Sequence, residues 1–86
     1  MRVGVRLSTR RLLIALIQRF LEENRYHYLT YRSFRRWLYR NRIRLEWHTV
    51  EREIRRLAEE GYLRRVFVSR NRVRFYPTPR LEEVVK

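Results

Sequence analysis

Side chains that can bind anions recur on one side of the segment between residues 46 and 60. They are His48, Thr49, Arg52 and Arg56, with Arg55 beside them. At about 100° per residue, these positions would share the helix face opposite an apolar stripe. The stripe comprises Val50, Ile54, Leu57 and Ala58. Guanidinium groups bind phosphates and guanine edges with paired hydrogen bonds, and hydroxyl and imidazole groups can contact bases or phosphates. The segment therefore predicts a helix with one buried side and one anion-binding side.

The net charge of the whole chain agrees with this local chemistry. Its 86 residues include 22 Lys+Arg and 9 Asp+Glu, which gives a formal net charge of +13. A positive field of this size favours a polyanionic partner, either nucleic acid or an anionic membrane surface. All the basic residues except Lys86 are arginine, which suits bidentate contacts and is also what a compositional bias would produce.

Neither an enzyme nor a metal site is predicted by the remaining reactive side chains. Ser8, Ser33 and Ser69 have no spacing to a histidine and a carboxylate that would make a catalytic triad. His27 and His48 are isolated, in a chain without cysteine or aspartate, so we expect no metal ion. We also expect no cofactor and no small-molecule ligand.

The absence of cysteine excludes disulfides and thiolate chemistry. The longest unbroken apolar run, residues 12–17, is far shorter than the roughly 20 residues that a membrane-spanning helix needs. Gln18 and Arg19 close the run, and no small-residue cleavage site follows it. We therefore expect a cytoplasmic protein, and a high content of charge without cysteine is compatible with a thermophilic source.

The apolar patterning predicts one domain over residues 1–86, with helices over 8–24, 30–40 and 46–60. The stripe of the first helix comprises Leu12, Leu13, Leu16, Ile17, Phe20 and Leu21, with Ser8 or Thr9 as its N-cap. Thr30 and Asn41 are the expected caps of the second helix. Trp37 and Trp47 fall on apolar stripes, so they are expected to pack in the core or at its rim.

The two ends of the chain and the segment after Gly61 are expected to be partly extended. Residues 1–7 alternate apolar and polar side chains, which indicates a strand or a basic arm. Gly61 is expected to end the third helix, and residues 63–76 to form a β-hairpin in which Asn71 adopts a positive φ. Thr78 and Pro79 can begin a short helix over 78–86.

Helix, short strand, helix, turn, helix and basic hairpin, in this order, resemble the winged helix-turn-helix family of DNA-binding domains over roughly residues 8 to 76. The most specific part is Thr49-Val50-Glu51-Arg52 followed by Ile54, Leu57, Gly61 and Leu63, which is similar to that family's recognition helix and first wing strand. The preceding Thr30, Phe34, Leu38 and Ile43 extend the likeness. The resemblance implies an α+β fold with a three-helix core and a β-hairpin wing.

The resemblance also implies a role for each basic element. The third helix would lie in the major groove, and the wing would lie along phosphates or enter the adjacent minor groove. Base contacts would come from His48, Thr49, Arg52 and Arg56. Phosphate contacts would come from Arg32, Arg35, Arg36, Arg44 and Arg55, and wing contacts from Arg70, Asn71, Arg72 and Arg74.

The chain departs from the family pattern at two positions near the start of the recognition helix. Glu46 and Trp47 stand where a serine or threonine cap is usual, so the start of the helix could shift by a residue or two. Glu51 is unusual near a phosphate surface, where it could pair with Arg55 one turn on or accept a hydrogen bond from a cytosine amino group.

The function expected from this pattern is sequence-specific binding of double-stranded DNA by a transcription regulator. Small, arginine-rich regulators of hyperthermophilic archaea and their viruses are similar, and a viral chain would act in the host cytoplasm. A homodimer is expected because both ends carry surplus apolar residues: Val3, Val5, Leu7, Leu81, Val84 and Val85. A nonspecific DNA-packaging protein and an RNA-binding winged helix remain alternatives. A protein-docking adaptor fits less well, because the exposed face is cationic rather than apolar.

Overall fold

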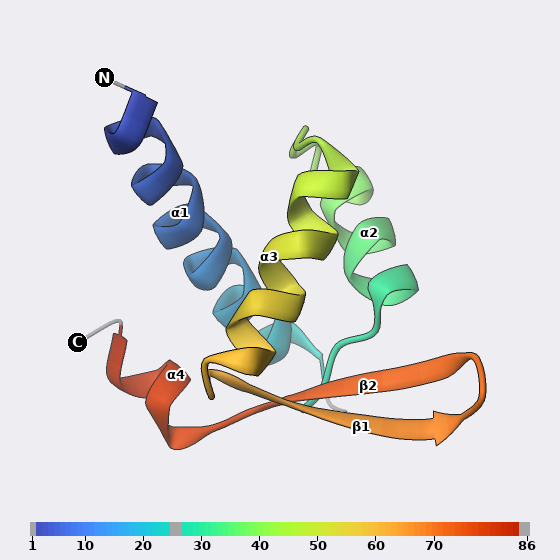
Figure 1. The fold of residues 1–86 in the computed structure, drawn as a ribbon. Coiled ribbons are helices and arrows are strands. Elements are labelled where there is room, and N and C mark those ends of the chain that lie inside the picture. Colours follow the sequence, from blue (N-terminus) through green and yellow to red (C-terminus); the bar gives the residue numbers. More distant parts are fainter. Residues whose placement is uncertain (1, 25–26, 85–86) are drawn as a thin grey trace.

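The computed structural model describes residues 2–24 and 27–84, with side chains from residue 9 onward in these ranges. Three helices are followed by an antiparallel β-hairpin and a short helix, an α+β layout that is compatible with a winged helix (Figure 1). The elements are α1 (Arg2–Glu23), α2 (Tyr31–Arg40), α3 (Trp47–Glu59), β1 (Leu63–Ser69), β2 (Arg72–Pro77) and α4 (Pro79–Val84).

The beginning of α1 differs from expectation. The helix starts at Arg2, so the strand or arm predicted over residues 1–7 is wrong for residues 2–7, and Ser8 and Thr9 lie inside the helix rather than capping it. Once the turns farther along the helix are packed, each added residue gains a backbone hydrogen bond at a small entropic cost, so the helix extends. In the described part of the chain the sheet consists of β1 and β2 alone, so a strand at the N-terminus would have had no partner strand.

The core forms around one side of α1. Its buried residues there are Leu13, Ile14, Leu16, Ile17, Phe20 and Leu21. Leu12, expected in this stripe, is 46% exposed, and Ile14 takes its place at 5%. The stripe is centred on the fully buried Ile17, from which Ile14 lies roughly 60° away around the helix and Leu12 roughly 140°.

An aromatic cluster joins α1 to α2. The ring of Phe20 meets those of Phe34 and Trp37 edge-on, with centroids 5.5 and 5.7 Å apart. The indole Nε1 of Trp37 donates a hydrogen bond to Glu23 Oε1 at 2.7 Å, which satisfies its polar atom at the edge of the core. Trp37 therefore packs in the core, as its position on the apolar stripe indicates.

Both ends of α2 are fixed by local hydrogen bonds. The Thr30 hydroxyl accepts from the Ser33 N–H, and the Ser33 hydroxyl accepts from the Thr30 N–H, which forms a capping box. At the other end Asn41 is the C-cap, and the Ile43 N–H donates to the Leu38 carbonyl at 2.9 Å. This Schellman closure places Arg42 at a φ of 57°, a left-handed conformation that costs a side-chain-bearing residue energy.

The end of α3 closes in the same way, with glycine at the left-handed position. Gly61 has a φ of 89°, and the Tyr62 N–H donates to the Leu57 carbonyl at 2.8 Å. The chain then enters β1 with Leu63 buried at 1% exposure. Gly61 thus sets the direction in which the hairpin leaves the helices.

The hairpin is anchored to the core at one end and projects from it at the other (Figure 1). Phe75 is fully buried, and it forms a β-bridge with Leu29, each backbone N–H donating to the other's carbonyl at 2.9 Å. The segment before α2 is therefore extended at Leu29, where the order of elements in the resemblance places a short strand. Beyond Phe75 the two strands run past the start of α2 toward a turn at Arg70 and Asn71.

Asn71 does not have the positive φ that the sequence predicted. Among the described residues, the non-glycine residues with a positive φ are His27 and Arg42. The register slips instead between Phe67 and Ser69, which leaves Val68 as an extra residue in β1. A bulge of this kind increases the local twist, so the turn can close without the left-handed residues that a regular two-residue hairpin requires.

Thr78 precedes α4 but uses its side chain elsewhere. Its hydroxyl donates to the Gly61 carbonyl at 2.6 Å and lies 3.1 Å from the Tyr62 carbonyl. These contacts tie the end of β2 to the end of α3. Leu81 then packs into the core at 1% exposure, and its carbonyl accepts a hydrogen bond from Gln18 of α1.

Candidate nucleic-acid interface

The side of α3 that faces away from the core carries the residues predicted to contact bases. Val50, Ile54 and Leu57 are buried, as the periodicity predicts. On the opposite side His48, Arg52, Arg55 and Arg56 are exposed, and Thr49 is half-buried. The structure therefore brings the five predicted α3 residues to one continuous outer surface.

Glu46 supplies the cap that the sequence lacked. Its carboxylate accepts hydrogen bonds from the backbone N–H groups of His48 and Thr49, and from the Thr49 hydroxyl. The hydroxyl contact, followed by that of the Thr49 N–H, lowers the pKa of Glu46 below its usual 4.5. The exposed N-terminus of α3, where anions bind readily, is thus already occupied by a carboxylate.

Glu51 pairs with a different partner from the one expected. Its carboxylate lies 3.9 Å from His48 Nδ1, and among the described residues it is not within ion-pair distance of Arg55. The half-exposed Arg56 lies 4.0 Å from Glu53, which is buried at 9% exposure beside the α1 side of the helix. Arg52 and Arg55 form no ion pair in the part of the chain that the structure describes.

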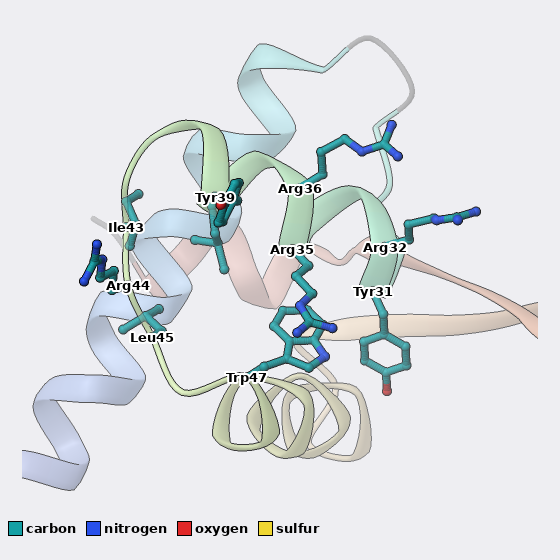
Figure 2. Close-up of a pocket in the computed structure, with 10 residues that line it drawn as sticks. Tyr31, Arg32, Arg35, Arg36, Tyr39, Ile43, Arg44, Leu45 and Trp47 are labelled. Carbon is teal, nitrogen blue, oxygen red and sulfur yellow. The ribbon is translucent and has the colours of Figure 1, made fainter.

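A groove of about 820 Å³ runs between α2, the following turn and the start of α3 (Figure 2). Its apolar floor includes Leu38, Ile43 and Leu45. Arg35 lies across this groove with its guanidinium 5.2 Å from the centre of the Trp47 ring. Arg32 and Arg36 instead point outward from α2 in Figure 2.

The four arginines predicted to bind phosphates around α2 are therefore not equivalent. Arg32 and Arg36 are exposed and free to reach a partner, and neither forms an ion pair within the described residues. Arg35 is held against Trp47, and Arg44 lies at the far side of the groove from Arg32 and Arg36 (Figure 2). Arg32 and Arg36 are the stronger phosphate-binding candidates.

Tyr31 occupies the junction of α2, α3 and the wing. Its ring centre lies 6.4 Å from that of Trp47 and 5.2 Å from that of Phe75. Burial raises the pKa of Tyr31 above 10.0. The nearby charges of Arg55 and Arg65 oppose this effect, and the charge of Glu51 adds to it. Arg55 of α3 and Arg65 of β1 therefore both lie near this tyrosine.

Arg65 was missed as a site residue, although its position carried a signal. Strand side chains alternate between faces, so Arg65 shares the face of the buried Leu63 and should lie on the helix side of the hairpin. Phe67 follows on the same face, with the Arg65 guanidinium 5.6 Å from its ring centre. Whether Arg65 is exposed depends on how far the hairpin extends past the helices, and this cannot be predicted from the alternation of residues along the strand.

The wing residues fall into two groups. Arg70, Asn71 and Arg72 at the turn are exposed. Arg74 is held instead against the other sheet face, with its guanidinium 4.5 Å from the Tyr28 ring centre and a hydrogen bond to the Tyr76 hydroxyl at 3.5 Å. Arg74 therefore helps to shape the hairpin, and Arg70, Asn71 and Arg72 stay candidates for contacting a partner.

Several arginines outside this surface have structural partners. Arg10 of α1 pairs with Glu60 at the end of α3, and this hydrogen bond raises the pKa of Arg10 and lowers that of Glu60. Arg80 lies over the ring of Tyr62, 4.8 Å from its centre. Arg19 lies 3.4 Å from Glu23 within α1. These residues provide arginine controls away from the candidate interface.

Within the described residues, no three acidic or histidine side chains meet in a group that could hold a metal ion. The helices of this part of the chain are also too short or too polar to cross a membrane. No protein-family model, curated protein or solved structure matches the chain.

Proposed function

We propose that this protein binds double-stranded DNA sequence-specifically and regulates transcription. The observation that carries the proposal is the continuity of exposed arginine from α2 across α3 to the wing. Residues 24–45 and 61–81 contain no acidic residue, whereas α3 and its two caps, residues 46–60, contain five, of which Glu53 is buried. Exposed arginines on three successive elements complement a phosphate backbone.

In the proposed complex α3 enters the major groove. A helix with its side chains is about 10–12 Å across, and the major groove is about 12 Å wide. Arg52 and Arg56 lie one turn apart on the outer side of α3, where their guanidinium groups can donate two hydrogen bonds each to guanine O6 and N7. His48 at the exposed start of the helix can contact a neighbouring base or phosphate.

Residues on either side of α3 would fix its register on the duplex. Arg32 and Arg36 extend from α2 toward one phosphate backbone, and Arg70 and Arg72 extend from the wing toward the flank. Arg55 and Arg65 lie between these two sets, near Tyr31. Contacts of this kind hold the helix in place but do not themselves read the sequence.

The alternative is a nonspecific DNA-packaging or RNA-binding protein, which the arginines of α2 and the wing would also serve. Binding competition distinguishes the two, with a duplex selected from a random pool, a scrambled duplex of equal length and a structured RNA. The regulator proposal expects the selected duplex to win by about 10³ or more. A preference below about tenfold, or a preference for the RNA, rejects it.

We further propose that the protein acts as a homodimer on two half-sites, in the cytoplasm of its cell or of a viral host. Leu81 no longer supports a dimer, because it is buried within the chain's own core, but Val84 is 43% exposed. The side chains of Val3, Val5 and Leu7, and all of Val85, lie outside the described residues. Sedimentation equilibrium with and without duplex tests this, and a monomer bound to a single half-site would exclude it.

A further inference from the structure

The wing exposes an apolar surface next to its turn. Phe67 is 68% exposed and Val68 is 49% exposed, and the two are adjacent in β1. Single exposed apolar residues are common on proteins, but a largely exposed phenylalanine beside an exposed valine on a projecting hairpin is a less ordinary arrangement. This pair is not used by the phosphate contacts proposed above.

The direction of Phe67 follows from the strand register. Phe67 pairs with Val73 and Arg65 pairs with Phe75, so all four side chains share one face of the hairpin. That face is buried at Phe75 and exposed at Phe67. The turn end of the hairpin projects beyond the helices (Figure 1). Phe67 therefore lies on the same face of the hairpin as Arg65 and Phe75, farther along β1 toward the turn.

The surroundings of Phe67 indicate the chemistry of that partner. The hairpin, residues 63–77, contains five arginines and no acidic residue. Arg65 already lies over the Phe67 ring, Arg70 follows in the turn, and Arg72 begins β2 on the opposite face of the hairpin from Phe67. An apolar protein surface would leave these charges without counterions, whereas a nucleic-acid groove offers stacked bases between two rows of phosphates.

We propose that Phe67 is a wedge that enters the minor groove beside the segment bound by α3, partly unstacks one base step and bends the duplex. The inference rests on the proposed DNA-binding function and adds a deformation to it. Pyrimidine–purine steps such as TA and CA unstack most readily, so the wedge makes the protein favour such a step at a position that its polar groups do not read. Specificity then comes from α3 and from the deformability of the flanking DNA.

The test uses the full chain and the selected duplex, labelled at both ends for energy transfer and carrying 2-aminopurine at the flanking step. Binding is measured in parallel by anisotropy. The wild-type protein should shorten the end-to-end distance and increase 2-aminopurine fluorescence. Phe67→Ala should lose most of both signals and bind about tenfold more weakly, while Phe67→Leu should retain part of them. Leu12→Ala, which removes an exposed apolar side chain from α1, is the matched control and should change neither.

The outcomes separate this proposal from the function on which it rests. If the wild-type protein does not bind duplex DNA, both are wrong. If it binds with selectivity but Phe67→Ala bends and unstacks the DNA as the wild type does, only the wedge is wrong. A Phe67→Ala variant that bends DNA normally but loses self-association would assign the patch to protein contacts and also overturn the wedge. Circular dichroism of each variant establishes that it is folded.

Discussion

The Thr49 hydroxyl donates a hydrogen bond to the Glu46 carboxylate at 2.6 Å, and the Thr49 backbone N–H donates to the same oxygen at 2.8 Å. One carboxylate therefore both caps α3 and holds the hydroxyl of a predicted base-contacting residue. Thr49 can still present its methyl group to a thymine, but its hydroxyl proton is engaged while Glu46 is ionised. The stability of α3 therefore depends on the ionisation of the Glu46 carboxylate at the N-terminus of the helix.

Acid should weaken this cap. Because the folded-state pKa of Glu46 lies below its usual 4.5, the ionised cap stabilises the protein fully above that pH, and the contribution is lost as pH falls through the lowered value. Thermal unfolding measured as a function of pH should show a decline on this acid limb that is shallower in Glu46→Gln. Glu59→Gln, on the exposed end of the same helix, is the control and should keep the wild-type slope.

Replacing Glu46 with serine should strengthen DNA binding. Serine is a good N-cap, so the helix keeps its start while the negative charge at its N-terminus disappears. We expect the affinity for duplex DNA to rise severalfold at low salt, with little change in the unfolding temperature. Fluorescence anisotropy at two salt concentrations measures the effect, which should shrink as salt increases. Unchanged affinity at low salt would mean that the start of α3 does not approach phosphate.

Replacing Arg52 or Arg56 with alanine should relax sequence discrimination. A bidentate guanine contact contributes about 1–3 kcal/mol of preference for the correct base. Each variant should therefore lose more affinity for the selected duplex than for the scrambled duplex, so the ratio of the two affinities should fall. Arg19→Ala makes the same change of charge on α1, away from the interface. Equal losses on both duplexes would reassign Arg52 and Arg56 to phosphate contacts.

Two arginines of the wing should behave differently when removed. Arg72→Ala should weaken binding uniformly across sequences and reduce the slope of log K against log salt by about 1, because one phosphate contact is lost. Arg74→Ala should also lower the unfolding temperature, since Arg74 packs on Tyr28 and bonds to Tyr76. Salt titrations and thermal unfolding of both variants distinguish a partner contact from a role in shaping the wing. Equal stability of the two variants would contradict the assignment of Arg74.

Two of the residues with a positive φ, Gly61 and Arg42, should respond in opposite ways to substitution. Gly61→Ala should lower the free energy of unfolding by about 1–2 kcal/mol, because a Cβ is strained at a φ of 89°. An added Cβ would meet Arg80 no closer than 3.7 Å, so the backbone conformation alone sets this cost. Arg42→Gly should be neutral to stabilising by up to about 1 kcal/mol, since it relieves the same strain. Urea unfolding measures both, and an Arg42→Gly variant less stable than Gly61→Ala would be the contrary result.

Much of the helical framework could be predicted from local patterns. Thr30 and Gly61 mark the ends of α2 and α3 because caps depend on a few neighbouring residues, and the burial of Val50 and Ile54 follows from a single periodicity. The start of α1 could not be predicted in this way. Residues 2–7 alternate apolar and polar side chains, as a strand does, but they are helical. The packed part of α1 that follows them favours extension of the helix through these residues.

The candidate interface was less accessible from the sequence, because it depends on how elements meet. Arg35 shares the exposed side of α2 with Arg32 and Arg36, yet only the placement of Trp47 shows that it is held in the groove. Arg65 belongs to the candidate interface because the hairpin brings it near Tyr31. Glu46 was not predicted to be the N-cap of α3 because glutamate is not among the usual N-cap residues. Its longer side chain nevertheless reaches the same backbone N–H groups.

The bridge between Leu29 and Phe75 gives the wing a mechanical role. Two backbone hydrogen bonds hold the hairpin there, and the residues between Arg65 and Phe75 extend from that point to the turn. Leu29 directly precedes the Thr30 cap of α2, so a load applied at the wing tip is delivered to the first turn of that helix. The bridge therefore couples the position of the hairpin turn to the start of α2.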